Sequence, residues 1–138
     1  MAGAKRLICR SDELLDGGRG VRFGVEFGGR ERSAFAIRYD GGVYAYFNEC
    51  GHVPAELDWQ PGEFFDSAKL YLICSIHGAL YSPRDGRCLG GRCQGRGLQP
   101  LVVFEEAGAV WLDLDRLLVG VARGGLPVFS KMEINNEK

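Results

Sequence analysis

Apolar and polar residues alternate over several short stretches of the chain, and this period of two predicts β-strands rather than helices. The pattern is clearest in three consecutive runs at residues 21–29, 31–40 and 43–50, which are separated by short glycine-containing turns. Three such runs in succession are typical of an antiparallel meander. No long segment shows the 3.6-residue period of an amphipathic helix, so the sequence predicts an all-β fold.

Shorter apolar runs extend this pattern on both sides of the meander. Strands are expected at residues 6–10 and 68–74. Residues 79–91 predict a hairpin, because the Pro-Arg-Asp-Gly sequence at 83–86 is typical of a tight turn.

Two more strands are expected in residues 98–114, around a turn at 105–109. Beyond them the pattern is weaker: residues 115–123 fit either a short helix or a last strand, and residues 132–138 are expected to be frayed. With 138 residues and no linker or internal repeat, we expect one domain over residues 1–138 with a modest core.

Composition and charge exclude several classes of function. The formal net charge is −1, so there is no basic excess that would favour nucleic acid as a partner. No apolar run is long enough to span a membrane, and the N-terminal residues lack a secretory pattern. We therefore expect a cytoplasmic protein without a membrane anchor, and a monomer. In that compartment cysteines are more often metal ligands or buried thiols than disulfides.

The candidate chemistry lies in two cysteine–histidine pairs. Cys50 and His52 are one residue apart, and Cys74 and His77 are two residues apart after a gap of 21 residues. The chain has only two histidines, and both fall in these pairs. Thiolate and imidazole ligands suit zinc or iron–sulfur chemistry rather than magnesium or calcium.

Two metal centres fit four such ligands. Zinc would bind all four tetrahedrally. A [2Fe–2S] cluster would take the two cysteines on one iron and the two histidines on the other. Cysteine–histidine zinc fingers usually place their second pair on a helix, whereas Gly78, Pro83 and Gly86 disfavour a helix here. The loop context favours the cluster.

Residues 43–104, with "CGH", "CSIHGALYSPRDGRCLGG" and "LQPL", resemble the Rieske [2Fe–2S] family. The resemblance implies an antiparallel β-sandwich base with a small cluster-binding subdomain at about residues 48–100. It implies that Cys50 and Cys74 bind the buried iron and that His52 and His77 bind the outer one. The residues that follow the second pair are then expected beside the cluster: Gly78, Ala79 and Tyr81.

The resemblance also indicates which kind of Rieske protein this is. Ring-hydroxylating oxygenases carry a second iron on two further histidines and a carboxylate, which this chain does not have. The Rieske proteins of membrane complexes carry an additional cysteine in each ligand loop, and these loops have none. The remaining interpretation is a ferredoxin-like electron carrier that has a reductase or oxygenase partner. Such a carrier is not itself an enzyme. The alternatives are an electron-transfer subunit of a larger complex, a redox sensor and a zinc-stabilised interaction module.

Three other features are open to two interpretations. Cys88 and Cys93 are interpreted as two unpaired thiols in a tight loop in preference to a redox-active pair or a small disulfide. Trp59 and the Phe64–Phe65 pair are expected to form a small core that fixes their loop, or Trp59 is a docking residue. Residues 53–68 carry only acidic charges, and residues 84–97 carry four arginines against one acid, so these loops are either simply solvated or steer a partner.

Overall fold

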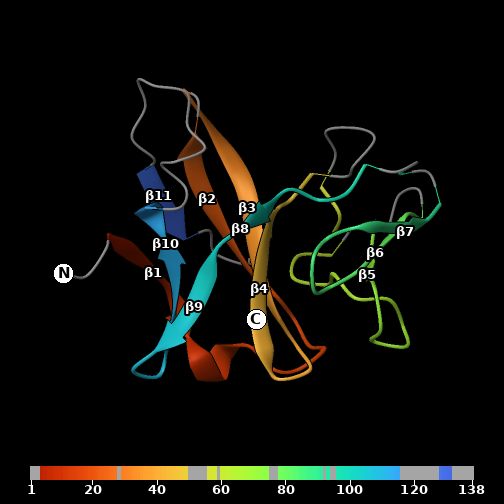
Figure 1. The fold of residues 1–138 in the computed structure, drawn as a ribbon, viewed down its shortest axis with the longest axis horizontal. Coiled ribbons are helices and arrows are strands. Elements are labelled where there is room, and N and C mark those ends of the chain that lie inside the picture. The colour runs from red at the N-terminus through yellow and green to blue at the C-terminus, as the bar shows by residue number, and fades with distance from the viewer. Residues whose placement is uncertain are drawn as a thin grey trace.

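The computed structural model describes residues 4–27, 29–49, 56–58, 60–74, 78–91, 93, 96–115 and 128–131. Within these ranges the chain forms three antiparallel sheets and one 3₁₀ turn, η1 (Ser11–Glu13), which confirms the all-β prediction (Figure 1). None of the helical residues in these ranges makes a helix long and apolar enough to cross a membrane.

The largest sheet contains the predicted meander. Its strand order is β11–β2–β3–β4–β8, with antiparallel pairs throughout. The bounds are β2 (Val21–Phe27), β3 (Arg30–Tyr39), β4 (Gly42–Phe47), β8 (Pro100–Leu101) and β11 (Val128–Lys131). Asp40 and Gly41 turn β3 into β4 with positive φ angles of 51° and 86°, and the carboxylate of Asp16 accepts hydrogen bonds from both amides.

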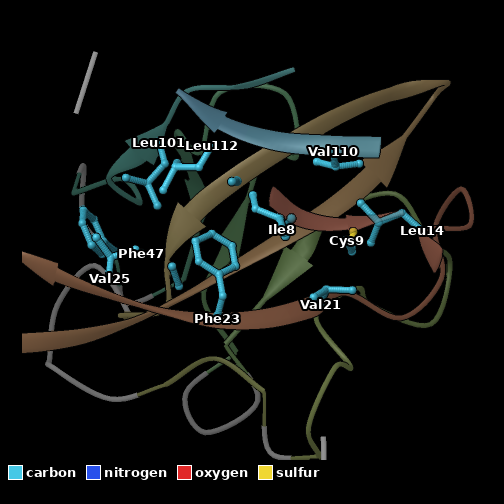
Figure 2. Close-up of a cluster of buried hydrophobic side chains, with 13 residues drawn as sticks. Ile8, Cys9, Leu14, Val21, Phe23, Val25, Phe47, Leu101, Val110 and Leu112 are labelled. Carbon is cyan, nitrogen blue, oxygen red and sulfur yellow. The ribbon is translucent and has the colours of Figure 1, made fainter. Parts of the chain in front are cut away.

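A second sheet packs against the first and completes the sandwich. Its strands are β1 (Lys5–Arg10), β10 (Ala109–Asp113) and β9 (Val103–Glu106), in that order. Lys5 stands opposite Asp113 in the register, so this sheet joins segments from distant parts of the sequence. Figure 2 shows the core between the two layers, where Ile8 and Leu112 from one sheet meet Phe23 and Phe47 from the other.

Strand β3 is buried on both of its faces. Ala34 and Ala36 belong to the sandwich core, whereas Phe35 and Ile37 belong to a second buried cluster on the opposite face. Successive side chains of a strand point to opposite sides, so one strand supplies both cores. Small alanines face the sandwich and large side chains face the second cluster.

The second cluster joins the sandwich to a small subdomain. The sheet of this subdomain consists of β5 (Leu72–Ile73), β6 (Leu80–Tyr81) and β7 (Cys88–Gly90), in that order, and appears in green in Figure 1. β6 and β7 form the hairpin expected from the turn at 83–86. Phe64 stacks on Phe35 with ring centroids 3.9 Å apart, so the expected small core around Phe64 is continuous with the second cluster.

The strand expected at residues 68–74 was too long, because only Leu72 and Ile73 are paired as a strand. Asp66 causes the difference: its side chain accepts hydrogen bonds from the amides of Leu70 and Tyr71, which holds this segment in a turn. Lys69 in this turn has a φ of 63°.

The single strand expected before residue 105 is divided between two sheets. β8 pairs with β4, whereas β9 pairs with β10, and Val102 lies between them with its side chain 41% exposed. The chain therefore changes layer at Val102. The predicted element at 115–123 and the frayed end at 132–138 lie outside the described residues for nearly all of their length, and the sequence did not predict β11.

Candidate metal centre

Cys74 lies at the end of β5, where its side chain is fully buried in the second cluster. It takes no part in a disulfide. Leu72, Phe64 and Tyr81 in the same cluster make its surroundings apolar. This is the environment in which a cysteine serves as a buried metal ligand, because the surrounding side chains exclude water from the sulfur.

The chain reverses direction directly after Cys74. The amide of Cys74 donates to the carbonyl of Ala79 over 2.9 Å, and the amide of Gly78 donates to the carbonyl of Cys74 over 2.7 Å. Gly78 has a φ of 72°, a left-handed conformation that favours glycine. The residues between these anchors, including His77, lie outside the described residues.

The segment that carries Cys50 and His52 is also outside the described residues, but both of its ends are described. Asn48, just after β4, donates from Nδ2 to Asp58 Oδ1 over 3.0 Å. The amide of Leu57 donates to Asn48 Oδ1 over 2.8 Å. The two ends of the segment are thus joined by buried hydrogen bonds, a role for Asn48 and Asp58 that the sequence analysis missed.

Arg22 of β2 supports the same junction. It donates from Nη2 to both carboxylate oxygens of Glu56 over 2.9 Å, and its Nε lies 3.6 Å from Asp58 Oδ2. Burial raises the pKa of Asp58 above its ordinary value, although hydrogen bonds from Asn48 and the Gly62 amide act in the opposite direction.

The acidic residues of 53–68 are therefore not an unpaired acidic surface. Asp58 is buried, Glu56 pairs with Arg22, and Glu63 pairs with Arg19. In the arginine-bearing loop, Arg84 pairs with Asp40, while Arg87 and Arg96 are exposed. Asp85 in the same loop is exposed as well and accepts a hydrogen bond from the amide of Arg87.

Ala79 and Tyr81, both expected beside the cluster, are fully buried. Gly91 packs directly on this segment, because a Cβ atom at Gly91 would lie 2.9 Å from Ala79 Cα and 3.1 Å from the carbonyl oxygen of Gly78. Gly91 also has a φ of 85°. No larger residue fits here without displacing the backbone that follows His77.

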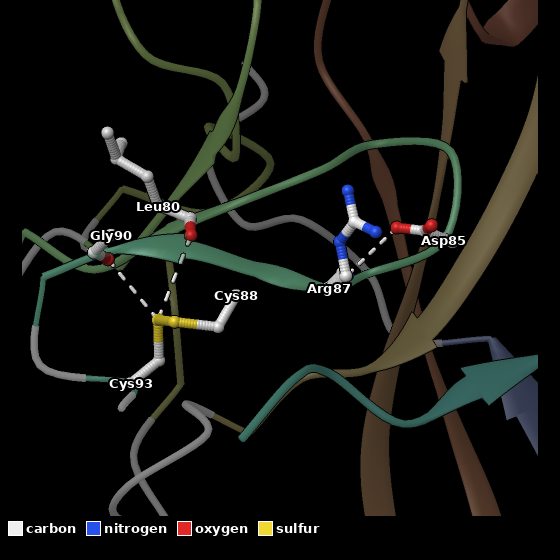
Figure 3. Close-up of a disulfide and its surroundings, with 6 residues drawn as sticks. All are labelled: Leu80, Asp85, Arg87, Cys88, Gly90 and Cys93. Carbon is white, nitrogen blue, oxygen red and sulfur yellow. Dashed lines mark hydrogen bonds between the residues drawn. A yellow bond between two sulfur atoms is a disulfide. The ribbon is translucent and has the colours of Figure 1, made fainter. Parts of the chain in front are cut away.

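Cys88 and Cys93 form a disulfide, so the preferred expectation of two unpaired thiols is wrong. The turn at Gly90 and Gly91 brings Cys93 back beside β7, with the two Cα atoms 5.9 Å apart, a normal separation for a disulfide. Figure 3 shows the bridge beneath β7, near the backbone of Leu80. It lies within one loop and does not connect the two candidate ligand loops.

The cysteine and histidine side chains of the two loops fit an iron–sulfur centre. The described part of the chain contains no group of three or more potential ligand side chains, since Cys74 is the one candidate ligand within it. That residue offers a buried sulfur at a tight turn, and the opposing segment is closed by the Asn48–Asp58 junction. Two anchored loops, each with one cysteine and one histidine, supply the thiolates and imidazoles that such a cluster takes.

Comparison with known families gives one match. The model of the Rieske [2Fe-2S] domain matches residues 4–112, which is most of the chain. The match includes both candidate ligand loops, the segment with Gly91 and the described strands of the sandwich except β11 and the last residue of β10. No curated protein matches the chain in sequence.

Several solved structures share the fold. The ferredoxin of carbazole 1,9a-dioxygenase from Nocardioides aromaticivorans IC177 superposes with a TM-score of 0.61 at 21% identity, over 80% of this chain and 97% of the ferredoxin. The quaternary ammonium Rieske monooxygenase CntA gives 0.63 at 24% identity, over 81% of this chain and 31% of that one. A chain from the reduced complex between oxygenase and ferredoxin in carbazole 1,9a-dioxygenase gives 0.62 at 19% identity, over 81% and 28%.

Proposed function

Because the chain belongs to the Rieske [2Fe-2S] domain family, we propose that it is a one-electron carrier that passes electrons to an oxygenase or a reductase. One observation carries this proposal. The fold shared with the ferredoxin covers 97% of that protein, whereas the fold shared with the monooxygenase CntA covers only 31% of that chain. The similarity thus extends over a whole electron carrier and over one portion of an oxygenase.

The cluster in this proposal is held by Cys50, His52, Cys74 and His77. The cysteine thiolates bind one iron and the histidine imidazoles bind the other, as in Rieske centres generally. The full burial of Cys74 supports its assignment to the inner iron. When bound, the cluster supplies a site that takes up and releases one electron.

The same ligand set leaves no histidine for a second iron site. A mononuclear iron on two histidines and a carboxylate would need two more histidines than the chain contains. We therefore assign this chain electron transfer and no oxygenation of its own. In the basic loop, the described arginines Arg84, Arg87 and Arg96 stand against one acid, Asp85, and Arg87 and Arg96 are exposed, which supports a protein partner that carries negative charge.

The partner is proposed to approach the tips of the two ligand loops. In sequence, residues 51–54 and 75–79 include Val53 and Ile76 and no charged residue, so contact with them needs no desolvation of charge. The imidazole-bound iron is the one nearer to these tips in the proposal. An electron would leave the protein at this surface.

The test begins with the purified protein under anaerobic conditions. The expected result is visible absorption of an iron–sulfur cluster, one electron taken up per chain on reduction, and transfer of that electron to ferricyanide, a negatively charged one-electron acceptor. A colourless protein that contains zinc would instead identify a zinc-stabilised module and would overturn the electron-carrier function.

The docking surface has its own test. Val53→Asp and Ile76→Asp should slow electron transfer to a negatively charged acceptor much more than they change the absorption spectrum and the reduction potential, both of which should stay nearly unchanged. Leu15→Asp is the matched control, because Leu15 is 70% exposed and lies outside both ligand loops. Unchanged transfer in the two loop variants would show that electrons leave by another face.

A further inference from the structure

We propose that Cys88 and Cys93 form a reversible dithiol–disulfide couple, a second redox site whose state is transmitted to the cluster loop through Gly91. The proposal rests on the proposed function, because the cluster is one of the groups that responds. It assigns the pair a thiol-exchange chemistry with dithiol reductants, in addition to the one-electron chemistry of the cluster.

The surroundings of the buried sulfur suit both redox states. Cys93 is fully buried, and its Sγ lies 3.2 Å from the carbonyl oxygen of Gly90 and 3.8 Å from that of Leu80 (Figure 3). A disulfide sulfur has no proton to donate, so these contacts are not hydrogen bonds in the oxidised form. In the reduced form the thiol of Cys93 has a carbonyl acceptor already in place. Reduction therefore does not leave a buried donor without a partner.

The link to the cluster loop is a direct backbone contact. Gly91 lies between the two cysteines in the sequence, and the bridge closes the loop around it. The same glycine packs against Gly78 and Ala79, where there is no room even for a methyl group. Opening the bridge releases the loop that holds Gly91 in this contact. The turn after Cys74 then loses part of its support.

The exchange reaction is balanced by an external dithiol. Its thiolate attacks Sγ of Cys88, because Cys88 is only partly buried whereas Cys93 is fully buried. The sulfur–sulfur bond breaks, Cys93 leaves as a thiolate and takes up a proton, and a mixed disulfide remains on Cys88. The second thiolate of the dithiol displaces Cys88, which is also protonated. The protein gains two electrons and two protons, and the dithiol becomes a disulfide.

The first experiment tests the couple itself. The holoprotein is equilibrated anaerobically with mixtures of reduced and oxidised dithiothreitol, then acid-denatured, alkylated and weighed by mass spectrometry. The oxidised protein should show three alkylated cysteines and the reduced protein all five. The bridge should re-form when the mixture is made more oxidising. A bridge that is reduced only when the protein unfolds would overturn the proposal.

The second experiment tests transmission. In the reduced form, amide hydrogen exchange in residues 70–82 should speed up, cluster loss should be about threefold faster, and the reduction potential should shift. Cys88→Ser/Cys93→Ser should reproduce all three changes without dithiothreitol, yet still assemble the cluster. Cys9→Ala is the matched control, since Cys9 is buried in the sandwich core and should leave the response to dithiothreitol unchanged.

Gly91→Ala separates the contact from the bridge. It should speed up the same amide exchange while the disulfide stays intact, because the added methyl group collides with Ala79. Equal exchange and equal cluster lifetime in the reduced and oxidised forms would overturn the proposal. If no form of the protein holds a cluster, the electron-carrier function fails, whereas the thiol count and amide exchange still decide whether the couple is real.

Discussion

Asn48 and Asp58 are joined by a buried hydrogen bond across the base of the segment that carries Cys50 and His52. The two residues are 1% and 7% exposed, and the donor and acceptor atoms lie 3.0 Å apart. Asn48 also accepts the amide of Leu57, and Asp58 accepts the amide of Gly62. The pair thus satisfies backbone groups that the irregular path of this segment would otherwise leave buried without partners.

Asn48→Ala should lower the free energy of unfolding by about 2–6 kcal/mol, because it leaves the Leu57 amide and one oxygen of Asp58 unsatisfied at a cost of about 1–3 kcal/mol each. Urea unfolding followed by tryptophan fluorescence gives this value. Gln60→Ala is the control, since Gln60 is an exposed residue of the same region. Equal stability of Asn48→Ala and the unmodified protein would show that water replaces the side chain.

Glu105 and Arg38 provide a pH-dependent contribution to stability. Arg38 donates to both oxygens of Glu105, over 3.1 Å and 2.6 Å, and these hydrogen bonds are the main cause that lowers the pKa of Glu105 below its ordinary value of 4.5. The ionised carboxylate is favoured in the folded state. Its contribution is complete above pH 4.5 and is lost as the pH falls through the lower pKa of the folded state.

Glu105→Gln should therefore destabilise the protein most at neutral pH, and the difference from the unmodified protein should shrink as the pH falls below 4.5. Urea unfolding at a series of pH values measures this. Arg38→Met should remove the same pH-dependent contribution, because the guanidinium is its source. A difference that widens on acidification would contradict the assignment.

Cys74→Ser should abolish the visible absorption of the cluster and reduce stability, because cluster binding contributes to the folding free energy. Cys9→Ser is a closely matched control, since both thiols are almost fully buried but Cys9 lies in the sandwich core. Absorption spectra and iron content of the two variants decide the matter. Normal iron content in Cys74→Ser would remove this residue from the ligand set.

The residues that are proposed to lie beside the cluster should set its reduction potential. High-potential Rieske proteins carry a serine and a tyrosine two and four residues after the second histidine, whereas this chain has Ala79 and Tyr81 there. With one donor instead of two, the potential should fall in the lower half of the range of about −150 to +300 mV. Ala79→Ser should raise the potential and Tyr81→Phe should lower it, as measured by protein-film voltammetry. Two variants with unchanged potentials would exclude this explanation.

Where the sequence predicted the fold well, local pattern and local structure agreed. The alternation in residues 21–47 corresponds to β2, β3 and β4, because their turns are short and both faces of β3 are covered. Alternation failed at residues 68–71, where the side chain of Asp66 imposes a turn on apolar residues. It also failed at Val102, where one apolar run contributes to two sheets.

The sequence predicted the chemistry of the candidate site, but it did not predict the residues that hold the site's loops in place. Spacing pointed to Cys74 as a candidate ligand, since a thiol and an imidazole two residues apart are informative without tertiary structure. The pairing of Glu56 with Arg22 depends on contacts between segments 34 residues apart, and no local pattern reveals it. The disulfide between Cys88 and Cys93 depends on the turn at Gly91, whose conformation the residue type permits but does not impose.

The pairing of β1 with β10 has a consequence for synthesis on the ribosome. The meander of β2, β3 and β4 pairs within residues 21–47 and can form early, whereas β1 has to wait for β10 at residues 109–113. Until then Ala34, Ala36 and their neighbours lack the second layer, and an apolar sheet face stays open to other nascent chains. Formation of the sheet β1–β10–β9 is therefore the folding step at which translation speed and chaperones control the yield of folded protein.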